Sequence, residues 1–150
     1  MEIAHDRAAS RLRGLPTRLV TQVAVLADRA TERALADTGL RRHHYALLVT
    51  LREFGPASQA DLGRRTRIDR SDIVAALNDL AERGLVDRSP DPGDRRRNVV
   101  TITEPGTDHL AELDRRLDRA QDELVAALSA DQRRQLVDLL TRILDDHAQR

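Results

Sequence analysis

The chain contains 150 residues, of which 40% are apolar and 33% are charged, and its 25 basic residues balance its 25 acidic residues. This length fits one domain, or one small domain with helical extensions. No cysteine is present, which excludes disulfides, thiolate metal sites and thiol redox sensing. All the basic residues are arginine and none is lysine. Because the net charge is zero, any affinity for nucleic acid has to come from locally placed arginines.

The first part of the chain predicts two helices. Apolar residues recur every three or four positions between Leu15 and Ala36, which is typical of one long amphipathic helix. A second helix is expected from Arg41 to Phe54, with Gly55-Pro56 ending it. The charged amino terminus and the lack of an apolar run approaching about 20 residues predict neither a signal peptide nor a membrane span. We therefore expect a cytoplasmic protein without a membrane partner.

The middle of the chain has the pattern of a helix-turn-helix. Ser58 with Asp61 three residues later predicts a capped short helix that ends at Arg65 or Thr66. Asp69-Arg70-Ser71-Asp72 repeats the capping pattern and opens a helix that runs to Arg83, where Gly84 occupies the usual position after a helix end.

The following segment predicts a β-hairpin and two more helices. Leu85–Ser89 and Asn98–Thr103 have strand character and flank a turn-rich loop from Pro90 to Arg97. A helix is expected to open at Thr103-Glu104-Pro105-Gly106, and Ser129 with Gln132 caps a last one. The predicted fold is mainly α with a small β-hairpin (α+β), and residues 40–103 form its compact centre.

One face of the predicted helix from Arg70 to Arg83 is suited to reading base pairs. Apolar residues at Ile73, Leu77 and Leu80 should point to the core. The opposite face then carries Arg70, Ser71, Val74 and Asn78. Guanidinium, amide and methyl groups near a helix N-terminus can contact guanine, adenine and thymine in the major groove. An ordinary solvated surface is the alternative interpretation.

Arginines gather on both sides of this helix. Candidates for contacts with the DNA backbone are Arg64, Arg65, Arg67, Arg95 and Arg97. Asp94 is expected to pair with the Arg96 guanidinium across the tight turn at Gly93 and to orient it forward. The alternative is a hydrophilic hairpin tip without a partner. Since Tyr45 and Phe54 are the only aromatic residues, single strands lack stacking platforms, and double-stranded DNA is the favoured nucleic acid.

The order of these motifs strongly resembles the MarR family of winged helix-turn-helix transcriptional regulators. The most specific element is Asp94-Arg95-Arg96, with Glu82-Arg83-Gly84-Leu85-Val86 before it and Thr101-Ile102-Thr103 after it. The resemblance covers roughly Leu15 to Leu144. It implies that residues 1–150 form a single MarR-like chain. It implies a repressor that binds a pseudo-palindromic operator as a homodimer, with the Arg70 helix in the major groove and Arg96 in the minor groove.

Two further expectations concern the homodimer and a ligand. Residues 15–37 and 104–147 carry more apolar surface than one small domain can cover, which favours a helical dimerisation region over purely intramolecular packing. The resemblance also implies that a small phenolic, aromatic or lipophilic ligand weakens DNA binding. His43, His44 and Tyr45 lie near the implied ligand site, and surface histidines with a core tyrosine are the alternative.

No cofactor, metal site or enzymatic activity is expected. His109 and Glu112 form at most a two-ligand edge, and zinc needs at least one more ligand. The chain also lacks a nucleophile elbow and a glycine-rich phosphate loop. Two other functions stay open, namely a winged-helix protein-interaction module without ligand response and a helical enzyme that uses His43 and His44.

Overall fold

The computed structural model describes residues 7–150 as a mainly helical chain with a small antiparallel sheet. The expectation about a signal peptide also concerns residues 1–6, which lie outside the described residues. The helices are α1 (Ser10–Arg13), α2 (Pro16–Leu35), α3 (Arg42–Phe54), α4 (Gln59–Thr66), α5 (Arg70–Glu82), α6 (Glu104–Leu124) and α7 (Ala130–Ala148), and the strands are β1 (Ala57–Ser58), β2 (Val86–Asp91) and β3 (Asp94–Ile102).

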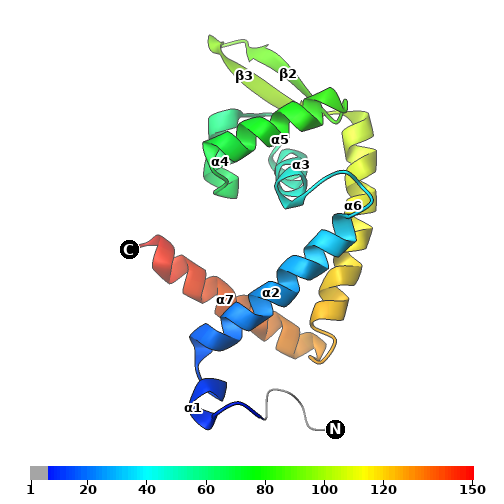
Figure 1. Cartoon of the computed structure of the whole chain (residues 1–150). Coiled ribbons are helices and arrows are strands. Elements are labelled where there is room, and N and C mark those ends of the chain that lie inside the picture. Colours follow the sequence, from blue (N-terminus) through cyan, green and yellow to red (C-terminus); the bar gives the residue numbers. More distant parts are fainter. Residues whose placement is uncertain (1–6) are drawn as a thin grey trace.

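The elements form two parts joined by α6. Figure 1 shows the β2–β3 hairpin at one end next to α3, α4 and α5, whereas α2 and α7 lie at the other end. The long helix α6 runs from the hairpin down to the turn before α7, and it packs along α2 on the way. No described helix combines the length and the apolar character needed to cross a membrane.

The hairpin is longer than the sequence predicts. The strand order is β1-β3-β2, and the ladder between β2 and β3 continues from Val86 opposite Ile102 to Asp91 opposite Asp94, with an irregularity after Pro90. The expected loop from Pro90 to Arg97 is therefore wrong, because only Pro92 and Gly93 form the turn. Ladder hydrogen bonds join backbone atoms, so charged side chains do not prevent this stretch from pairing.

Three of the four predicted side-chain caps are confirmed. The Ser58 hydroxyl accepts a hydrogen bond from the Asp61 amide, and the Thr103 hydroxyl accepts one from the Gly106 amide. Ser129 and Gln132 cap each other's backbone amides at the start of α7. The expected cap at Asp69 is wrong, since its side chain makes no capping hydrogen bond although it precedes α5.

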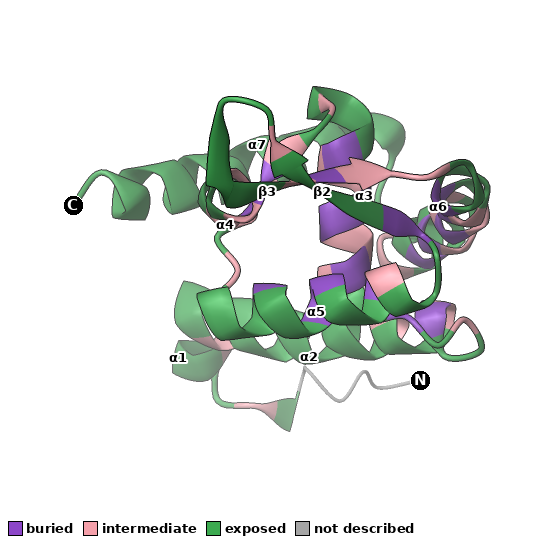
Figure 2. Ribbon diagram, turned by 90° about the horizontal axis from the view of Figure 1, so that it is seen from above, coloured by how far each residue is buried: buried purple, intermediate pink, exposed green. Residues whose placement is uncertain are grey.

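The core lies where α3 crosses the helix-turn-helix and the sheet. Its fully buried side chains are Leu47, Leu48, Leu51, Leu62, Ile73, Leu77, Leu80, Val86, Val100, Leu110 and Leu113. Figure 2 shows that α5 is buried along the side that faces α3 and exposed along the other. Since these branched aliphatic side chains come from α3, α4, α5, α6, β2 and β3, the core fixes the hairpin relative to α5.

The start of α6 is pressed against the end of the helix-turn-helix. The Leu85 carbonyl oxygen accepts a hydrogen bond of 3.1 Å from the Thr103 amide. A Cβ atom at position 106 would lie 2.1 Å from that same oxygen. Gly106 thus allows a backbone-to-backbone approach that no side chain permits.

Candidate nucleic-acid interface

The exposed face of α5 carries the four residues expected to read bases. Ile73, Ala76, Leu77 and Leu80 point to the core. Arg70, Ser71, Val74 and Asn78 are exposed on the other side, and we call these four residues the reading face. Its side chains combine donors, an acceptor and a methyl surface, and the face carries no carboxylate. This chemistry fits the edges of base pairs in the major groove.

Two arginines of the helix-turn-helix have side-chain partners inside the protein. Arg64 forms an ion pair with Asp61 one turn earlier on α4. The Arg65 guanidinium lies 3.8 Å above the ring of Phe54. Arg67 ends α4 in the left-handed conformation, with φ of 56°, and is exposed. The contacts of Arg64 and Arg65 hold these two side chains at the surface, where phosphate can still reach them.

The two arginines nearest the hairpin tip project into solvent. Arg95 and Arg96 are exposed on β3, and in the part of the chain that the structure describes no carboxylate forms an ion pair with either of them. Asp94 does contact Arg96, but its oxygen accepts a 3.0 Å hydrogen bond from the backbone amide. The expected pairing of Asp94 with the Arg96 guanidinium is therefore wrong, because the carboxylate caps the strand backbone and leaves the side chain free.

A groove between the hairpin and the helix-turn-helix collects further arginines. Its lining residues are Ser58, Gln59, Ala60, Gly63, Arg64, Ile68, Arg70, Ile73, Arg96 and Arg97. Arg97 donates a 2.9 Å hydrogen bond to the Ser58 hydroxyl, so it joins β3 to the start of α4. Four guanidinium groups beside a helix N-terminus favour an anionic occupant such as a backbone phosphate.

Arg88 is a site residue that the sequence did not identify. It lies on β2 and donates a 2.6 Å hydrogen bond to the Asn78 amide oxygen on the reading face. Arg88 thus connects β2 to α5, and Arg97 connects β3 to Ser58, the β1 residue that caps α4. Local sequence patterns do not reveal such pairs, because each joins a strand to an element from another part of the chain.

His43, His44 and Tyr45 have different surroundings in the structure. His43 lines a groove between the end of α2 and the start of α3, together with Leu40 and Arg42. The buried His44 accepts a 2.9 Å hydrogen bond at Nδ1 from the Arg41 amide, and its Nε2 lies 3.2 Å from an oxygen of Asp79 on α5. Since Nδ1 accepts, Nε2 carries the proton and donates to Asp79.

Tyr45 joins the helix-turn-helix part to α6. Its hydroxyl donates a 2.6 Å hydrogen bond to one oxygen of Asp114, and Arg52 pairs with the other oxygen. Burial, followed by the hydrogen bond to Asp114, raises the pKa of Tyr45 to about 12. The phenol is thus a permanent donor near neutral pH, and both oxygens of Asp114 bind α3.

The geometry of His44 predicts a loss of stability in mild acid. Burial lowers the pKa of His44 below its ordinary value of 6.5, and the hydrogen bond to Asp79 only partly offsets this, while Arg83 and Arg41 lower it further. The unfolded chain therefore takes up a proton that the folded chain refuses. Stability is complete above pH 6.5 and falls as the pH decreases through the folded pKa, by at most about 1.4 kcal/mol per pH unit.

The His44→Gln variant isolates this effect. Glutamine can accept from the Arg41 amide and donate to Asp79, but it does not titrate. Urea unfolding from pH 7.5 to 5 should show the wild type losing its advantage over the variant as the pH falls. A constant difference in unfolding free energy over this range would contradict the role assigned to His44.

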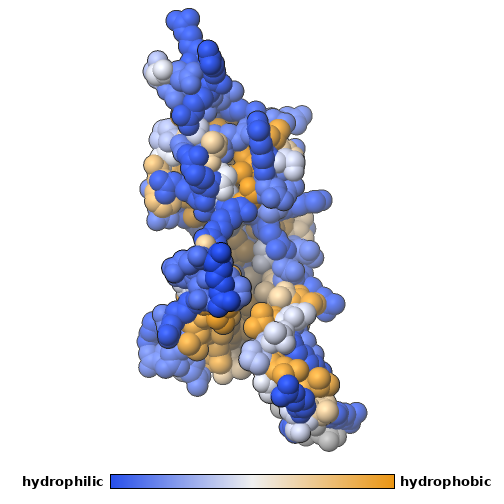
Figure 3. Space-filling model, turned by 90° about the vertical axis from the view of Figure 1, so that its left-hand side faces the viewer, coloured by the Kyte–Doolittle hydropathy of each residue, from blue (hydrophilic) through white to orange (hydrophobic). Residues whose placement is uncertain are grey.

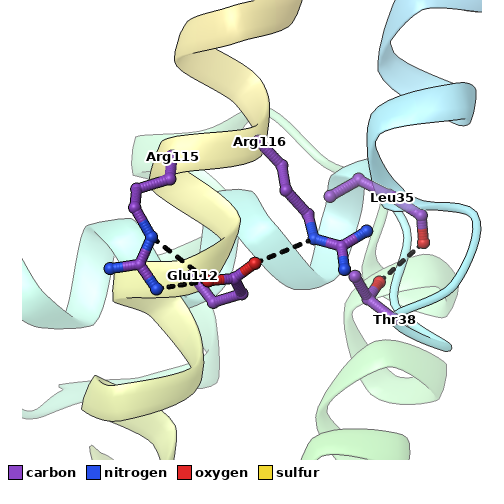
Figure 4. Close-up of polar contacts among 5 residues, drawn as sticks. All are labelled: Leu35, Thr38, Glu112, Arg115 and Arg116. Atoms are coloured by element: carbon purple, nitrogen blue, oxygen red, sulfur yellow. Dashed lines mark hydrogen bonds and ion pairs between the residues drawn. The ribbon is translucent and has the colours of Figure 1, made fainter.

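The Glu112 carboxylate, which the sequence offers beside His109, is engaged by two arginines. Figure 4 shows the Glu112 carboxylate held by Arg115 on one side and by Arg116 on the other, all on α6. Two guanidinium groups neutralise this carboxylate and disfavour a cation beside it. Among the described residues, no group of three or more histidine, cysteine, aspartate or glutamate side chains is placed to hold a metal ion.

Comparisons with known proteins extend over nearly the whole chain. A sequence model of the MarR family matches residues 38–97. The HTH-type transcriptional repressor NicR of Pseudomonas putida is 31% identical over 145 residues, which cover 92% of either chain. The PcaV transcriptional regulator of Streptomyces coelicolor, solved in complex with its natural ligand, is 28% identical with a TM-score of 0.80, over 92% of this chain and 97% of that one.

A third similar protein shows the same fold on DNA. A mutant MarR from E. coli, crystallised in complex with operator DNA, has a TM-score of 0.78 at 23% identity and covers 91% of this chain and 99% of its own. These matches cover 91–92% of this chain, which is more than the helix-turn-helix and the hairpin alone account for.

Proposed function

The chain belongs to the MarR family of DNA-binding transcriptional regulators, and from this premise we propose that it is a homodimeric repressor of a pseudo-palindromic operator. The observation that carries the proposal is the combination of the reading face with the free guanidinium groups of Arg95 and Arg96 on the neighbouring hairpin. In this proposal α5 lies in the major groove and Arg96 enters the minor groove. Arg64, Arg65, Arg67, Arg95 and Arg97 anchor the backbone.

The apolar surface of the flanking helices supports the homodimer. Exposed aliphatic side chains on α2 and α7 include Leu19, Val20, Val23, Leu26, Val137, Leu139, Ile143 and Leu144. Of the described residues of α7, none is buried. Figure 3 shows apolar side chains gathered on the part of the molecule where α2 and α7 lie, whereas the hairpin end is hydrophilic. We assign residues 15–37 and 104–147 to a dimerisation region and residues 40–103 to the DNA-binding lobe.

A small aromatic or lipophilic ligand is proposed to control the affinity for DNA. The related PcaV regulator was solved with its natural ligand, which supports a ligand response in this chain. His43 lines a groove beside the end of α2 and is the member of the His43–Tyr45 group best placed to meet such a ligand. We propose that the chain acts in the cytoplasm, where a DNA-binding regulator can reach its operator.

The Arg96→Ala variant tests the role assigned to the hairpin. Because Arg96 is exposed and unpaired, its loss should weaken operator binding by about 1–3 kcal/mol without changing the oligomeric state or the unfolding temperature. A gel shift at fixed salt measures the affinity, and Arg11→Ala on α1, which is exposed and lies outside both the dimerisation region and the DNA-binding lobe, is the matched control. Equal affinities for the Arg96 variant and the wild type would rule out minor-groove insertion by the hairpin.

A further inference from the structure

The contact between Arg88 and Asn78 determines how the reading face presents an amide. Arg88 Nη2 lies 2.6 Å from Asn78 Oδ1, a distance typical of a strong charge-assisted hydrogen bond. The position of Arg88 is set by the sheet, where it pairs with Val100 of β3. Asn78 is exposed on α5, so a partner from outside the protein can reach this side chain.

The chemistry of the two groups leaves one orientation. A guanidinium group carries only donors, and a carboxamide carries an acceptor oxygen and a donor nitrogen. The oxygen of Asn78 must therefore face Arg88, and Nδ2 is the end that remains for another partner. An asparagine without such a neighbour can rotate its amide by about 180° and present either end.

We propose that Arg88 is a specificity-determining positioning residue, which holds the Asn78 amide with Nδ2 toward the base and thereby excludes cytosine from one operator position. The proposal rests on the proposed function, in which α5 lies in the major groove. Guanine, adenine and thymine each offer an acceptor on that edge, at O6 and N7, N7, or O4. Cytosine offers only the N4 donor, which a fixed Nδ2 cannot match.

This assignment differs from ordinary backbone binding by Arg88. If Arg88 contacted only a phosphate, its removal would weaken binding to every sequence equally. It would also lower the salt dependence of DNA binding by about the amount that one phosphate contact contributes. If Arg88 orients Asn78, its removal lets the amide turn its oxygen to cytosine N4. The base preference then changes at a single position.

The experiment is selection from a pool of randomised duplexes at fixed salt with the full-length protein. The Asn78→Ala variant identifies the operator position that Asn78 reads. The Arg88→Met variant keeps the aliphatic stem but loses the donors, and Arg95→Met removes the same charge from the same hairpin without touching Asn78. Unfolding temperatures confirm that the variants are folded.

We expect wild-type protein and Arg95→Met to discriminate against cytosine at that position by at least about fivefold. Arg88→Met should accept cytosine there to within about twofold of the preferred base, with other positions unchanged. The proposal is overturned if Arg88→Met keeps the wild-type preference with uniformly weaker binding, or if Asn78→Ala changes no position. A wild-type protein that selects no sequence at all would instead refute the proposed function.

Discussion

The Ile143→Asp variant is expected to be monomeric and to lose operator affinity by at least about 100-fold. Ile143 is 53% exposed on α7 although it is aliphatic, and its neighbours on the same helix are exposed aliphatic residues as well. A buried, unpaired carboxylate in an interface is strongly destabilising. A monomer binds one half-site and loses the effective concentration that links the two DNA-binding lobes, which is the reason for the large effect.

Sedimentation equilibrium measures the oligomeric state, and fluorescence anisotropy with labelled operator duplex measures the affinity. The matched control is Thr141→Asp, which introduces the same charge on the same helix but is turned about 160° from Ile143 around the axis. This control should remain dimeric and bind DNA. A dimeric Ile143→Asp protein would show that α7 does not lie in the interface.

The Gly106→Ala substitution is expected to reduce the free energy of unfolding by about 3 kcal/mol. The new methyl group would lie 2.1 Å from the Leu85 carbonyl oxygen and close to the Ile102 side chain. The Leu85 oxygen also accepts a hydrogen bond from the Thr103 amide, so it cannot move aside without breaking that bond. The better helix propensity of alanine, about 1 kcal/mol, offsets only part of this loss.

Thermal unfolding should show the Gly106→Ala variant melting about 6–12 °C below the wild type. Gly14→Ala is the matched control, since the nearest atom to its new Cβ would be 3.9 Å away and its stability should change by less than about 0.5 kcal/mol. Equal unfolding temperatures for the wild type and the Gly106→Ala variant would mean that the start of α6 can shift away from Leu85.

Helices and their capped starts were predictable because their signals are local. The periodic apolar residues predict α2 as Leu15–Ala36, and the structure has Pro16–Leu35. The hydroxyls of Ser58, Thr103 and Ser129 also cap as expected. Asp69 shows the limit of such patterns, since an acidic residue before a helix can have the right spacing and still not turn its side chain to the backbone.

The contacts that shape the candidate interface could not be predicted from local patterns. Arg88 meets Asn78, and His44 meets Asp79 across 35 positions. The two-residue strand β1 has no periodicity of its own and exists because β3 passes beside it. The hairpin arginines were assigned to a loop because of their charge, whereas backbone pairing alone determines that they lie on a strand.

Because the two oxygens of Asp114 on α6 bind Tyr45 and Arg52 on α3, these two helices should move together as one rigid unit. With 21 residues, α6 is about 31 Å long. A tilt of about 10° about its far end would carry the attached lobe through about 5 Å, which exceeds the rise of about 3.4 Å between stacked bases along one strand. In the proposed dimer, a small change in the angle between the two copies is thus sufficient to move the two α5 helices out of register with their half-sites.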